Sequence, residues 1–508
     1  MDALAVALLA VQKILLFSIV IVVAAFVWHL LRRPRNLPPG PRGYPLVGSN
    51  LSFGDRPDRW LMGIAKQYGP VVSVYMGPKL TIVLNDVDSV RDAFLKQGDV
   101  FSERPSSGLI DIVSKVILGY VPPIEHGVIG SSGLLWKEQR KFALGKLREF
   151  GMGKVSLETK IKEEISVLLM EIKTKSSEPF DIQELVTTSV SNVICSIVFG
   201  NRYEYGEKQL DDLMRALNAL FVLFEVTGLL NYAPWLRHIP GFRGQAAEVK
   251  RYFEVIHGVL KQQIAAHLLD YDESNIRDFI DVYIKEMHSE HSKGRHQSTT
   301  FNMEELLFVV WDLFAAGTET TSTTTRWAML FMLKYPDVCK KVQAEIDDVI
   351  GRGRMPCMAD KTKMPYTEAT IMEIQRLGTI VPLGVPHSTS EKVEFRGFSI
   401  PAHTQVIANQ TAVMLDQTYF PNPEKLSPER YLDENGNITK IDALIPFSIG
   451  RRVCLGEALA KMELFLLFTS ILQNFNLELP GGVTEPSLDG IFGITWMPKA
   501  NKIRFCMR

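Results

Sequence analysis

The chain has 508 residues, of which 46% are hydrophobic and 22% charged, and its formal net charge is −1. This balance is typical of a globular protein with a large core, and the near-zero charge without a long basic run argues against a nucleic-acid partner. The five cysteines are scattered and none forms a C-x-x-C pair. That argues against a disulfide framework and a structural zinc site, and it fits a reducing compartment.

The amino-terminal segment is apolar. From Ala3 to Leu31 only four residues interrupt the apolar run. As a helix, its last 18 residues, Ile14 to Leu31, would rise roughly 27 Å, close to the ~30 Å hydrocarbon thickness of a bilayer. Arginines follow at positions 32, 33 and 35, so the positive-inside rule places the rest of the chain in the cytosol. A cleaved signal peptide is the alternative, but the apolar run is long and no small-residue cleavage site follows it. We therefore predict that residues 1–31 are a single-pass transmembrane signal anchor.

A proline-rich segment comes next. Residues 37–45 read Leu-Pro-Pro-Gly-Pro-Arg-Gly-Tyr-Pro. Proline fixes φ and disfavours helix in the preceding residue, so this segment is predicted to be stiff and non-helical. We predict a basic and proline-rich linker over residues 32–50. Residues 51–508 are predicted to be one large domain, because no internal repeat or boundary signal follows.

The domain is predicted to be mainly α with a small β region. Strand patterns occur at Val71–Tyr75 and Thr81–Leu84, and long helical patterns then continue to about residue 377. The polar stretch from Lys285 to Thr300 is typical of a surface loop. The last third of the chain mixes short strands, turns and one long helix that starts at Glu457.

One helical stretch, from about Asn302 to Leu333, contains the sequence Ala-Ala-Gly-Thr-Glu-Thr-Thr over residues 315–321. Glycine followed by hydroxyl residues is locally unfavourable in a helix. Two interpretations remain open from the residues alone. The segment is either a tolerated weak point in a buried helix or a functional site.

Two further pairs of residues place polar groups on one helix face. Glu373 and Arg376 are three residues apart, a spacing that is usually a solvated ion pair, and Arg430 follows in a turn-rich segment. Trp136 and Arg140 are four residues apart and present an indole N–H and a guanidinium.

Cys454 lies in the most informative segment of the chain. The segment from Phe447 to Gly456 matches Phe-x-x-Gly-x-Arg-x-Cys-x-Gly at all five fixed positions. Such a loop lets backbone N–H groups point at the sulfur, and the positive end of the following helix favours a thiolate. A thiolate held in this way is suited to be the proximal ligand of haem iron. A buried free cysteine that packs as a small hydrophobe is the alternative.

With this motif the chain resembles the haem-thiolate monooxygenases of the cytochrome P450 superfamily, and every signature follows in family order. The resemblance extends to the microsomal animal enzymes of family 2. Segments at Arg277–Tyr283 and Met364–Arg376 resemble the members that hydroxylate long-chain fatty acids. The segment between Arg104 and Trp136 is longer than in the drug-metabolising members, so the roof of the substrate pocket is expected to differ from theirs.

The resemblance implies a role for each site residue. Cys454 ligates the iron of haem b, and donors to the two haem propionates are Arg104, Trp136, Arg140, His387 and Arg452. Thr320 and Glu319 manage protons on the distal helix. A structural network joins Glu373, Arg376 and Arg430. The expected walls of the substrate pocket are Phe314, Ala315, Ala316, Ile380, Val381, Gly384, Val385 and Phe492.

The implied protein is a monooxygenase of the endoplasmic reticulum membrane with its catalytic domain in the cytosol. It would use O2 and electrons from NADPH, delivered by NADPH–cytochrome P450 reductase with cytochrome b5 as a second donor, to oxidise a lipophilic substrate. A positive proximal face should receive the reductase, and it would include Lys137, Lys141, Lys146, Arg451 and Lys461.

Two alternatives remain. Haem-thiolate isomerases and dehydratases need no reductase, and members of that kind usually lack the distal threonine that Thr320 supplies. A haem-binding sensor or electron carrier would not need the acid and alcohol pair of Glu319 and Thr320. NADPH consumption with purified reductase distinguishes the three.

Overall fold

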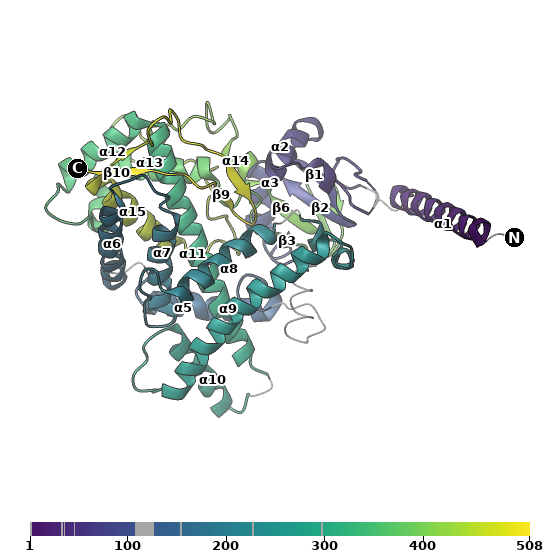
Figure 1. Ribbon diagram of the computed structural model, residues 1–508, viewed down its shortest axis with the longest axis horizontal. Coiled ribbons are helices and arrows are strands. Elements are labelled where there is room, and N and C mark those ends of the chain that lie inside the picture. Colours follow the sequence, from purple (N-terminus) through teal and green to yellow (C-terminus); the bar gives the residue numbers. More distant parts are fainter. Residues whose placement is uncertain are drawn as a thin grey trace.

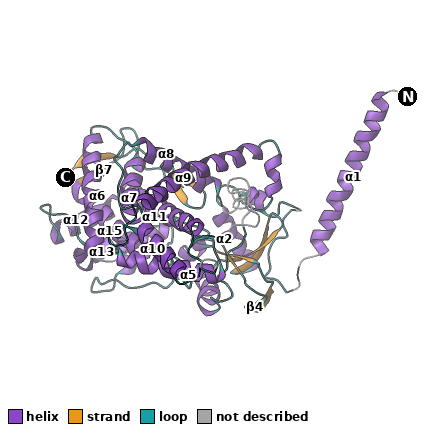
Figure 2. Ribbon diagram, turned by 90° about the horizontal axis from the view of Figure 1, so that it is seen from below, coloured by secondary structure: helices purple, strands orange, loops and turns teal. Residues whose placement is uncertain are grey.

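Helices form most of the computed structural model, and a small sheet lies on the side from which the amino-terminal helix projects (Figures 1 and 2). The structure describes residues 3–31, 34, 36–44, 46–106, 126–152, 155–225, 228–295 and 298–508. The arginines at 32, 33 and 35, and residues 107–125 of the long segment before Trp136, lie outside the described residues. The predicted fold class is confirmed.

The helices are α1 (Ala3–Leu31), α2 (Pro57–Tyr68), α3 (Val87–Arg91), α5 (Gly133–Glu149), α6 (Val155–Lys175), α7 (Gln183–Val198), α8 (Lys208–Leu223), α9 (Phe242–Asp270), α10 (Phe279–Ser292), α11 (Met303–Lys334), α12 (Pro336–Val349), α13 (Pro365–Gly378), α14 (Gln410–Met414) and α15 (Glu457–Asn474). A π-helical turn, η2, spans Asp92–Lys96. Short 3-10 turns are η1 (Asn50–Ser52), η3 (Leu229–Asn231), η4 (Pro234–His238), η5 (Met358–Lys363) and η6 (Pro428–Tyr431).

The strands are β1 (Val71–Met76), β2 (Lys79–Leu84), β3 (His387–Ser388), β4 (Val393–Phe395), β5 (Phe398–Ile400), β6 (Gln405–Ala408), β7 (Phe475–Glu478), β8 (Gly490–Phe492), β9 (Trp496–Pro498) and β10 (Arg504–Met507). The four-stranded sheet has the order β1-β2-β6-β3, with β2 and β6 parallel and the other pairs antiparallel. The two predicted strands are β1 and β2. They are buried and pair around a turn at Gly77, whose positive φ of 55° suits glycine.

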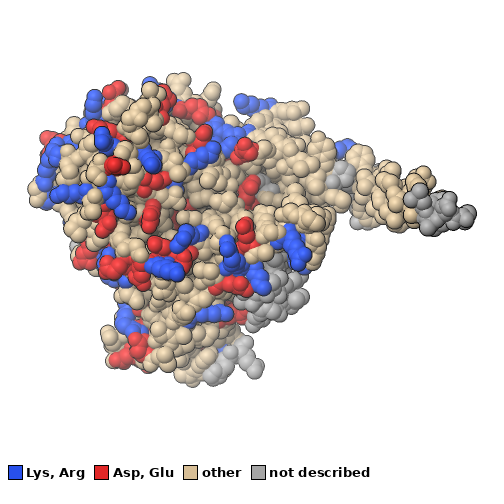
Figure 3. Space-filling model, viewed as in Figure 1, with Lys and Arg blue, Asp and Glu red and all other residues tan. Residues whose placement is uncertain are grey.

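Helix α1 is the only described helix that is long and apolar enough to cross a membrane. Its window Ala7–Trp28 has a mean hydropathy of 2.5, and none of this window is buried against the domain. Where Figure 3 describes α1, the visible face of the helix is tan, whereas acidic and basic groups are mixed over the rest of the molecule. This finding agrees with the predicted apolar helix.

The proline-rich segment packs against the domain. Ser73 in β1 donates from its backbone N–H to the carbonyl of Pro39 at 3.0 Å and from its hydroxyl to the carbonyl of Pro38 at 2.7 Å. A Cβ atom at Gly40 would lie 2.1 Å from the carbonyl oxygen of Ser73. These contacts hold the segment to the sheet, while the domain boundary at residue 50 remains a prediction.

Helix α11 is central because it packs against α7, α9, α13 and α15. It begins after Asn302, whose side chain accepts from the backbone N–H of Glu305 at 2.9 Å. A Cβ atom at Gly317 would lie 2.5 Å from Ile194 Cδ1 on α7. The glycine of the distal motif therefore allows α7 and α11 to approach each other closely.

The prediction of a surface loop from Lys285 to Thr300 is wrong for its first half. Helix α10 continues to Ser292 because one face of it remains apolar, with Tyr283, Ile284 and Met287 buried. The polar residues occupy the opposite face, and a polar composition alone does not distinguish an amphipathic helix from a loop.

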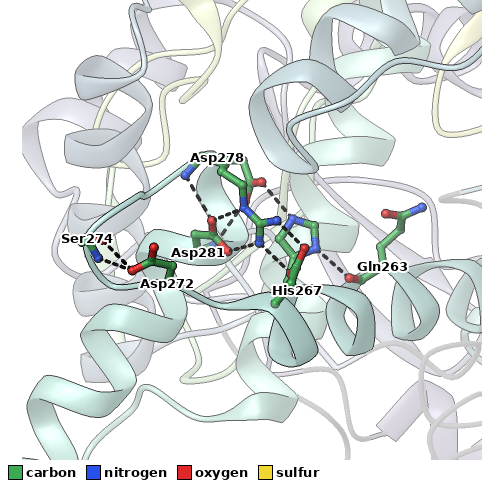
Figure 4. Close-up of polar contacts among 8 residues, drawn as sticks. Gln263, His267, Asp272, Ser274, Asp278 and Asp281 are labelled. Atoms are coloured by element: carbon green, nitrogen blue, oxygen red, sulfur yellow. Dashed lines mark hydrogen bonds and ion pairs between the residues drawn. The ribbon is translucent and has the colours of Figure 1, made fainter.

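A buried ion-pair cluster joins the end of α9 to the start of α10 (Figure 4). His267 contacts the carbonyl of Gln263 through Nδ1 at 2.7 Å and Asp278 Oδ2 through Nε2 at 2.8 Å. Arg277 donates to both carboxylate oxygens of Asp281, at 2.7 and 2.9 Å.

Three of these side chains, His267, Asp278 and Asp281, form the only cluster of three or more His, Cys, Asp or Glu residues within the described part of the chain whose ligand atoms are close enough to share a metal ion. The guanidinium of Arg277 already provides the positive charge there, so the cluster is an ion-pair network. The Arg-Asp-Phe-Ile-Asp sequence at 277–281 is explained by this contact, together with the capping of α10 by Asp278.

Candidate functional site

The loop before α15 is shaped by close contact with the π-helical turn η2. Gly450 has a positive φ of 83°, and a Cβ atom there would lie 2.1 Å from the carbonyl oxygen of Phe94. The backbone N–H of Cys454 donates to the carbonyl of Phe447 at 3.0 Å. Two of the fixed positions of the motif, Phe447 and Gly450, therefore fold the loop back and bring Cys454 to the start of α15.

The side chain of Cys454 is exposed, although the protein surrounds much of it. Burial raises the pKa of the thiol, while the backbone N–H of Gly456 and the charge of Arg140 act in the opposite direction. A bound metal cation would reverse the pKa shift, because a coordinating thiol is deprotonated.

Arg452 is anchored close to Trp136. Its guanidinium carbon lies 3.8 Å from the centre of the Trp136 ring. The guanidinium also donates to the carbonyls of Ser102 and Ser131, at 2.8 and 2.6 Å. The Trp136 indole N–H is buried and has no hydrogen-bond partner among the described residues. An unpaired buried donor is costly, so this N–H is available to an anionic group.

Arg104 and Arg140 approach the same region. Arg104 donates to the carbonyls of Val385 and Pro386, at 3.0 and 2.7 Å, and Arg140 donates to the carbonyl of Val453. Burial, and then the neighbouring charge of Arg140, lower the pKa of Arg104 to about 10. The two guanidiniums are therefore close enough to repel each other, which a bound anion would relieve.

His387 also belongs to this region. Its ring stacks on Phe94 at 3.9 Å, and Nδ1 donates to the carbonyl of Phe101 at 2.7 Å. Burial, Arg104 and Arg452 lower its pKa well below the ordinary range, so the imidazole is neutral and Nε2 is an acceptor. A carboxylate placed beside it would favour the protonated ring, which could then donate.

Thus the structure gathers the five predicted propionate donors and Cys454 from segments far apart in the sequence. The clustered guanidiniums and the unpaired indole N–H fit a group that carries carboxylates and lies over the Cys454 sulfur. This arrangement is typical of haem-thiolate proteins.

The two predicted proton-handling residues are held differently on α11. Thr320 donates from Oγ1 to the carbonyl of Ala316 at 2.8 Å. Glu319 is buried, and its Oε1 accepts from Thr323 at 2.8 Å. Burial raises the pKa of Glu319 to about 7, against the lowering effects of Thr323 and Arg326. Glu319 can therefore both release and take up a proton near neutral pH.

The predicted pocket residues of α11 have different surroundings. Phe314 is fully buried, and its ring lies 6.0 Å from that of Phe199, the residue directly after α7. Ala315 is buried, and Ala316 is half-buried. Phe314 therefore packs between helices.

The remaining predicted wall residues come together through backbone contacts. The carbonyl of Ile380 accepts from the N–H of Trp496 at 2.8 Å, and Phe492 and Trp496 are paired in the β8–β9 hairpin. Val381 and Gly384 form a turn, with a 3.0 Å hydrogen bond between their backbones, and Val385 is exposed.

The predicted structural network is assembled in the fold. Arg376 donates to both carboxylate oxygens of Glu373 at 2.7 Å, and Arg430 lies 3.1 Å from Glu373 Oε1. Sequence reasoning missed two further partners of Glu373, the Tyr431 hydroxyl at 3.1 Å and the Ser427 N–H at 3.0 Å. Tyr431 directly follows Arg430, so the η6 segment contributes several groups to one carboxylate.

Two acidic residues of α11 that the sequence analysis did not single out hold the chain before α5. Asp312 Oδ2 accepts from the N–H groups of Val128 and Ile129 at 2.6 and 2.8 Å. Glu305 accepts from the N–H of Gly127 at 3.0 Å and pairs with His126. Glu305 and Asp312 are seven residues apart, which places them on one helix face, and that spacing was the available signal.

Comparison with known proteins identifies the family. The cytochrome P450 family model matches residues 38–505. The chain is 39% identical to cytochrome P450 2U1 of Rattus norvegicus, over 96% of this chain and 94% of the relative. It is 42% identical to cytochrome P450 2C28 of Mesocricetus auratus, over 94% of each chain, and 38% identical to human cytochrome P450 2C8, over 99% of each chain. The chain therefore belongs to the cytochrome P450 family, as a family 2 monooxygenase with a haem-thiolate cofactor.

Proposed function

We propose that this protein is a membrane-anchored, NADPH-dependent monooxygenase that inserts one atom of O2 into a lipophilic small molecule. The observation that carries this proposal is the Cys454 thiol beside a cluster of three arginines, at the start of α15, which packs against α11, the helix that bears Glu319 and Thr320. The bound haem supplies oxygen activation, and the protein supplies orientation, charge and protons.

Each residue of the cluster has a defined task in this proposal. Cys454 Sγ holds the iron, and the guanidiniums of Arg104, Arg140 and Arg452 bind the propionate carboxylates, together with the indole N–H of Trp136. His387 joins them once it is protonated. Paired guanidinium and carboxylate groups fix orientation as well as affinity.

Thr320 and Glu319 control protons on the distal side. The Thr320 hydroxyl donates to the carbonyl of Ala316, and its oxygen can still accept a hydrogen bond from a water molecule. Glu319 exchanges protons near neutral pH. General acid–base groups work best when their pKa lies near the operating pH.

We propose the endoplasmic reticulum membrane as the location, with α1 as a single-pass anchor and the domain in the cytosol. NADPH–cytochrome P450 reductase is the proposed electron donor, with cytochrome b5 as a second donor. The apolar α1 supports the anchor. Lys137 and Lys141 support a docking face for the reductase, since they lie exposed on α5, the helix that turns Trp136 inward.

The substrate class is proposed as lipophilic. The narrower proposal of a long-chain fatty acid rests on the resemblance of two segments. One of them, at Arg277–Tyr283, forms the ion-pair cluster between α9 and α10. The other, in α13, carries the network of Glu373, and both therefore serve structural contacts.

The proposal is tested with the purified, haem-loaded protein and with Cys454→Ser. Reduced wild-type protein with CO should show the red-shifted Soret band of thiolate ligation, and Cys454→Ser should lose it. With purified reductase, NADPH consumption should rise on addition of a fatty acid, steroid or xenobiotic that is oxidised. A thiolate spectrum in Cys454→Ser, or product formation without reductase or peroxide, would contradict the proposal.

A further inference from the structure

Glu463 is a buried carboxyl to which the proposed function assigns no role. It lies on α15, nine residues after Cys454, and is 1% exposed. The Thr321 hydroxyl donates to Glu463 Oε2 at 3.3 Å, and Oε1 has no hydrogen-bond partner among the described residues. Nothing in these contacts compensates a full negative charge.

The partner of Glu463 lies on the turn of α11 that bears the proposed proton-handling residues. Most hydroxyl groups of this turn bond within α11: Thr320 to Ala316, Ser322 and Thr323 to Glu319, Thr324 to Thr320, and Thr325 to Thr321. Thr321 instead reaches another helix. Gly317 and these hydroxyl residues are weak helix formers, so the turn depends on such tertiary contacts to hold its position.

The surroundings of Glu463 favour the neutral acid. Burial raises its pKa to about 8, and the hydrogen bond of Thr321 only partly opposes this. On α11 the nearest charged groups in sequence are Glu319 and Arg326, which act on each other.

The other elements packed against α15 direct their acidic groups elsewhere: on η5 Asp360 pairs with Arg354, and Glu478 on β7 is exposed. On α6, Glu164 pairs with Arg202. On α13, Glu373 pairs with Arg376. On α12, Glu345 accepts from the backbone N–H groups of Tyr366 and Thr367.

We propose that Glu463 is a positioning residue of the monooxygenase, whose neutral carboxyl, held by Thr321, fixes the α11 turn that carries Glu319 and Thr320. The functional half of this inference rests on the proposed role of those two residues. If Glu463 loses its proton, a buried charge faces the turn, and water or a shift of α11 must accommodate it.

The test uses hydrogen exchange of the α11 amides in the haem-loaded protein from about pH 6 to about pH 9, corrected for the intrinsic pH dependence of exchange. Wild-type exchange at residues 316–325 should accelerate by roughly tenfold as pH passes 8, when the buried acid ionises. Glu463→Gln keeps the shape and stays neutral, so it should show no such acceleration. Glu463→Leu and Thr321→Val lose the contact and should exchange faster at every pH.

Product formed per NADPH is measured over the same pH range. It should decline above pH 8 in the wild type but not in Glu463→Gln. Glu478→Gln, at an exposed glutamate of β7, is the control and should behave as wild type in both measurements.

Identical exchange profiles for wild type and Glu463→Gln would overturn the inference. The expected exchange profiles combined with equal coupling in both proteins at every pH would keep the structural role of Glu463 and overturn its functional half. Because exchange does not depend on the chemistry of Thr320, a failure of the proposed proton path would leave the exchange result in place. The Glu463→Gln comparison remains decisive even where Glu463→Leu does not fold.

Discussion

At the scale of single residues, Thr320 has both a structural contact within α11 and a proposed role in proton handling. Its hydroxyl bonds to Ala316 one turn earlier, as Thr324 bonds to Thr320 one turn later, with 2.8 Å in both cases. The two threonines therefore make equivalent contacts with the helix, but only Thr320 belongs to the Glu-Thr pair of the distal motif.

Replacing Thr320 with alanine should keep the haem and divert electrons to peroxide. We expect product per NADPH to fall by at least about tenfold, because positioned proton-transfer groups typically contribute about 100-fold or more. The measurement is NADPH consumption, product and peroxide in one reaction with purified reductase. Thr324→Ala is the matched control, since it removes the same kind of bond from α11. Equal coupling in Thr320→Ala and Thr324→Ala would contradict the assignment.

At the scale of elements, the junction of α9 and α10 depends on a charged histidine. Both ring nitrogens of His267 face acceptors, the carbonyl of Gln263 and the carboxylate of Asp278. Burial alone would lower the pKa of His267, but the contacts with Asp278, Gln263 and Asp281 outweigh it, so the pKa is raised. The ion pair of Arg277 with Asp281 completes the junction.

This junction should make the stability of the domain depend on pH. Because the folded-state pKa of His267 is raised, its contribution is fully present below about pH 6.5, the value for an unfolded histidine, and is lost as pH rises through the folded-state value. His267→Gln should cost about 2 kcal/mol in the acidic range and less at higher pH. Unfolding free energies measured at several pH values test this. A constant difference between the two proteins would show that the imidazolium charge has no role.

At the scale of the whole molecule, glycosylation at one residue, Asn437, can test on which side of the membrane the domain lies. Three glycosylation sequons begin at Asn50, Asn409 and Asn437. Asn409 is fully buried and donates to the carbonyl of Asp58 and to Asn85, and Asn50 accepts from the backbone N–H of Gly77. Asn437 is exposed.

We predict that Asn437 carries no glycan in the native membrane, because a cytosolic domain never meets the glycosylation machinery. Treatment with an endoglycosidase should leave the electrophoretic mobility unchanged. A version with a cleavable secretory signal in place of α1 should gain a glycan at Asn437 and lose it in Asn437→Gln. A glycan at Asn437 in the native protein would reverse the proposed topology and exclude a cytosolic reductase.

The proposed reductase face can be tested with Lys141, which forms no ion pair with the residues that the structure describes. Lys461 is 2.7 Å from Glu457, Arg451 is 2.6 Å from Asp99, and Lys146 is 3.0 Å from Glu149. Lys141 is exposed on α5. We expect Lys141→Glu to raise the apparent KM for reductase several-fold at low ionic strength and less at high salt, since complementary charge acts mainly on association and is screened.

Turnover driven by a peroxide should be unchanged in Lys141→Glu, because that reaction bypasses the reductase. Lys175→Glu, an exposed lysine at the end of α6, is the control for a general effect of charge reversal. The same KM for reductase in the Lys141→Glu and wild-type proteins at low salt would place the docking face elsewhere.

Local sequence patterns were sufficient to predict several helices and strands and to identify the short motifs that carry the proposed chemistry. The apolar run of α1, the strand-like runs of β1 and β2, and the glycine-containing cysteine motif all depend on neighbours within a few residues, so sequence alone identified them. The same holds for Glu373 and Arg376, which meet on one helix turn. The polar face of α10 was misread as a loop because composition without periodicity is ambiguous.

Contacts between distant segments were decided by the tertiary structure. Arg104 donates a hydrogen bond to Val385, 281 residues away. Arg452 donates to Ser131, 321 residues away, and Thr321 donates to Glu463, 142 residues away. Such contacts depend on how helices and loops pack, and packing responds to shape and volume over the whole core rather than to local spacing. The sequence by itself therefore indicated the family and the helical class, and it predicts Cys454 as the haem ligand. Only the fold decided that Gly317 serves helix packing, that Asp312 holds the chain before α5, and that a buried acid on α15 faces the distal helix.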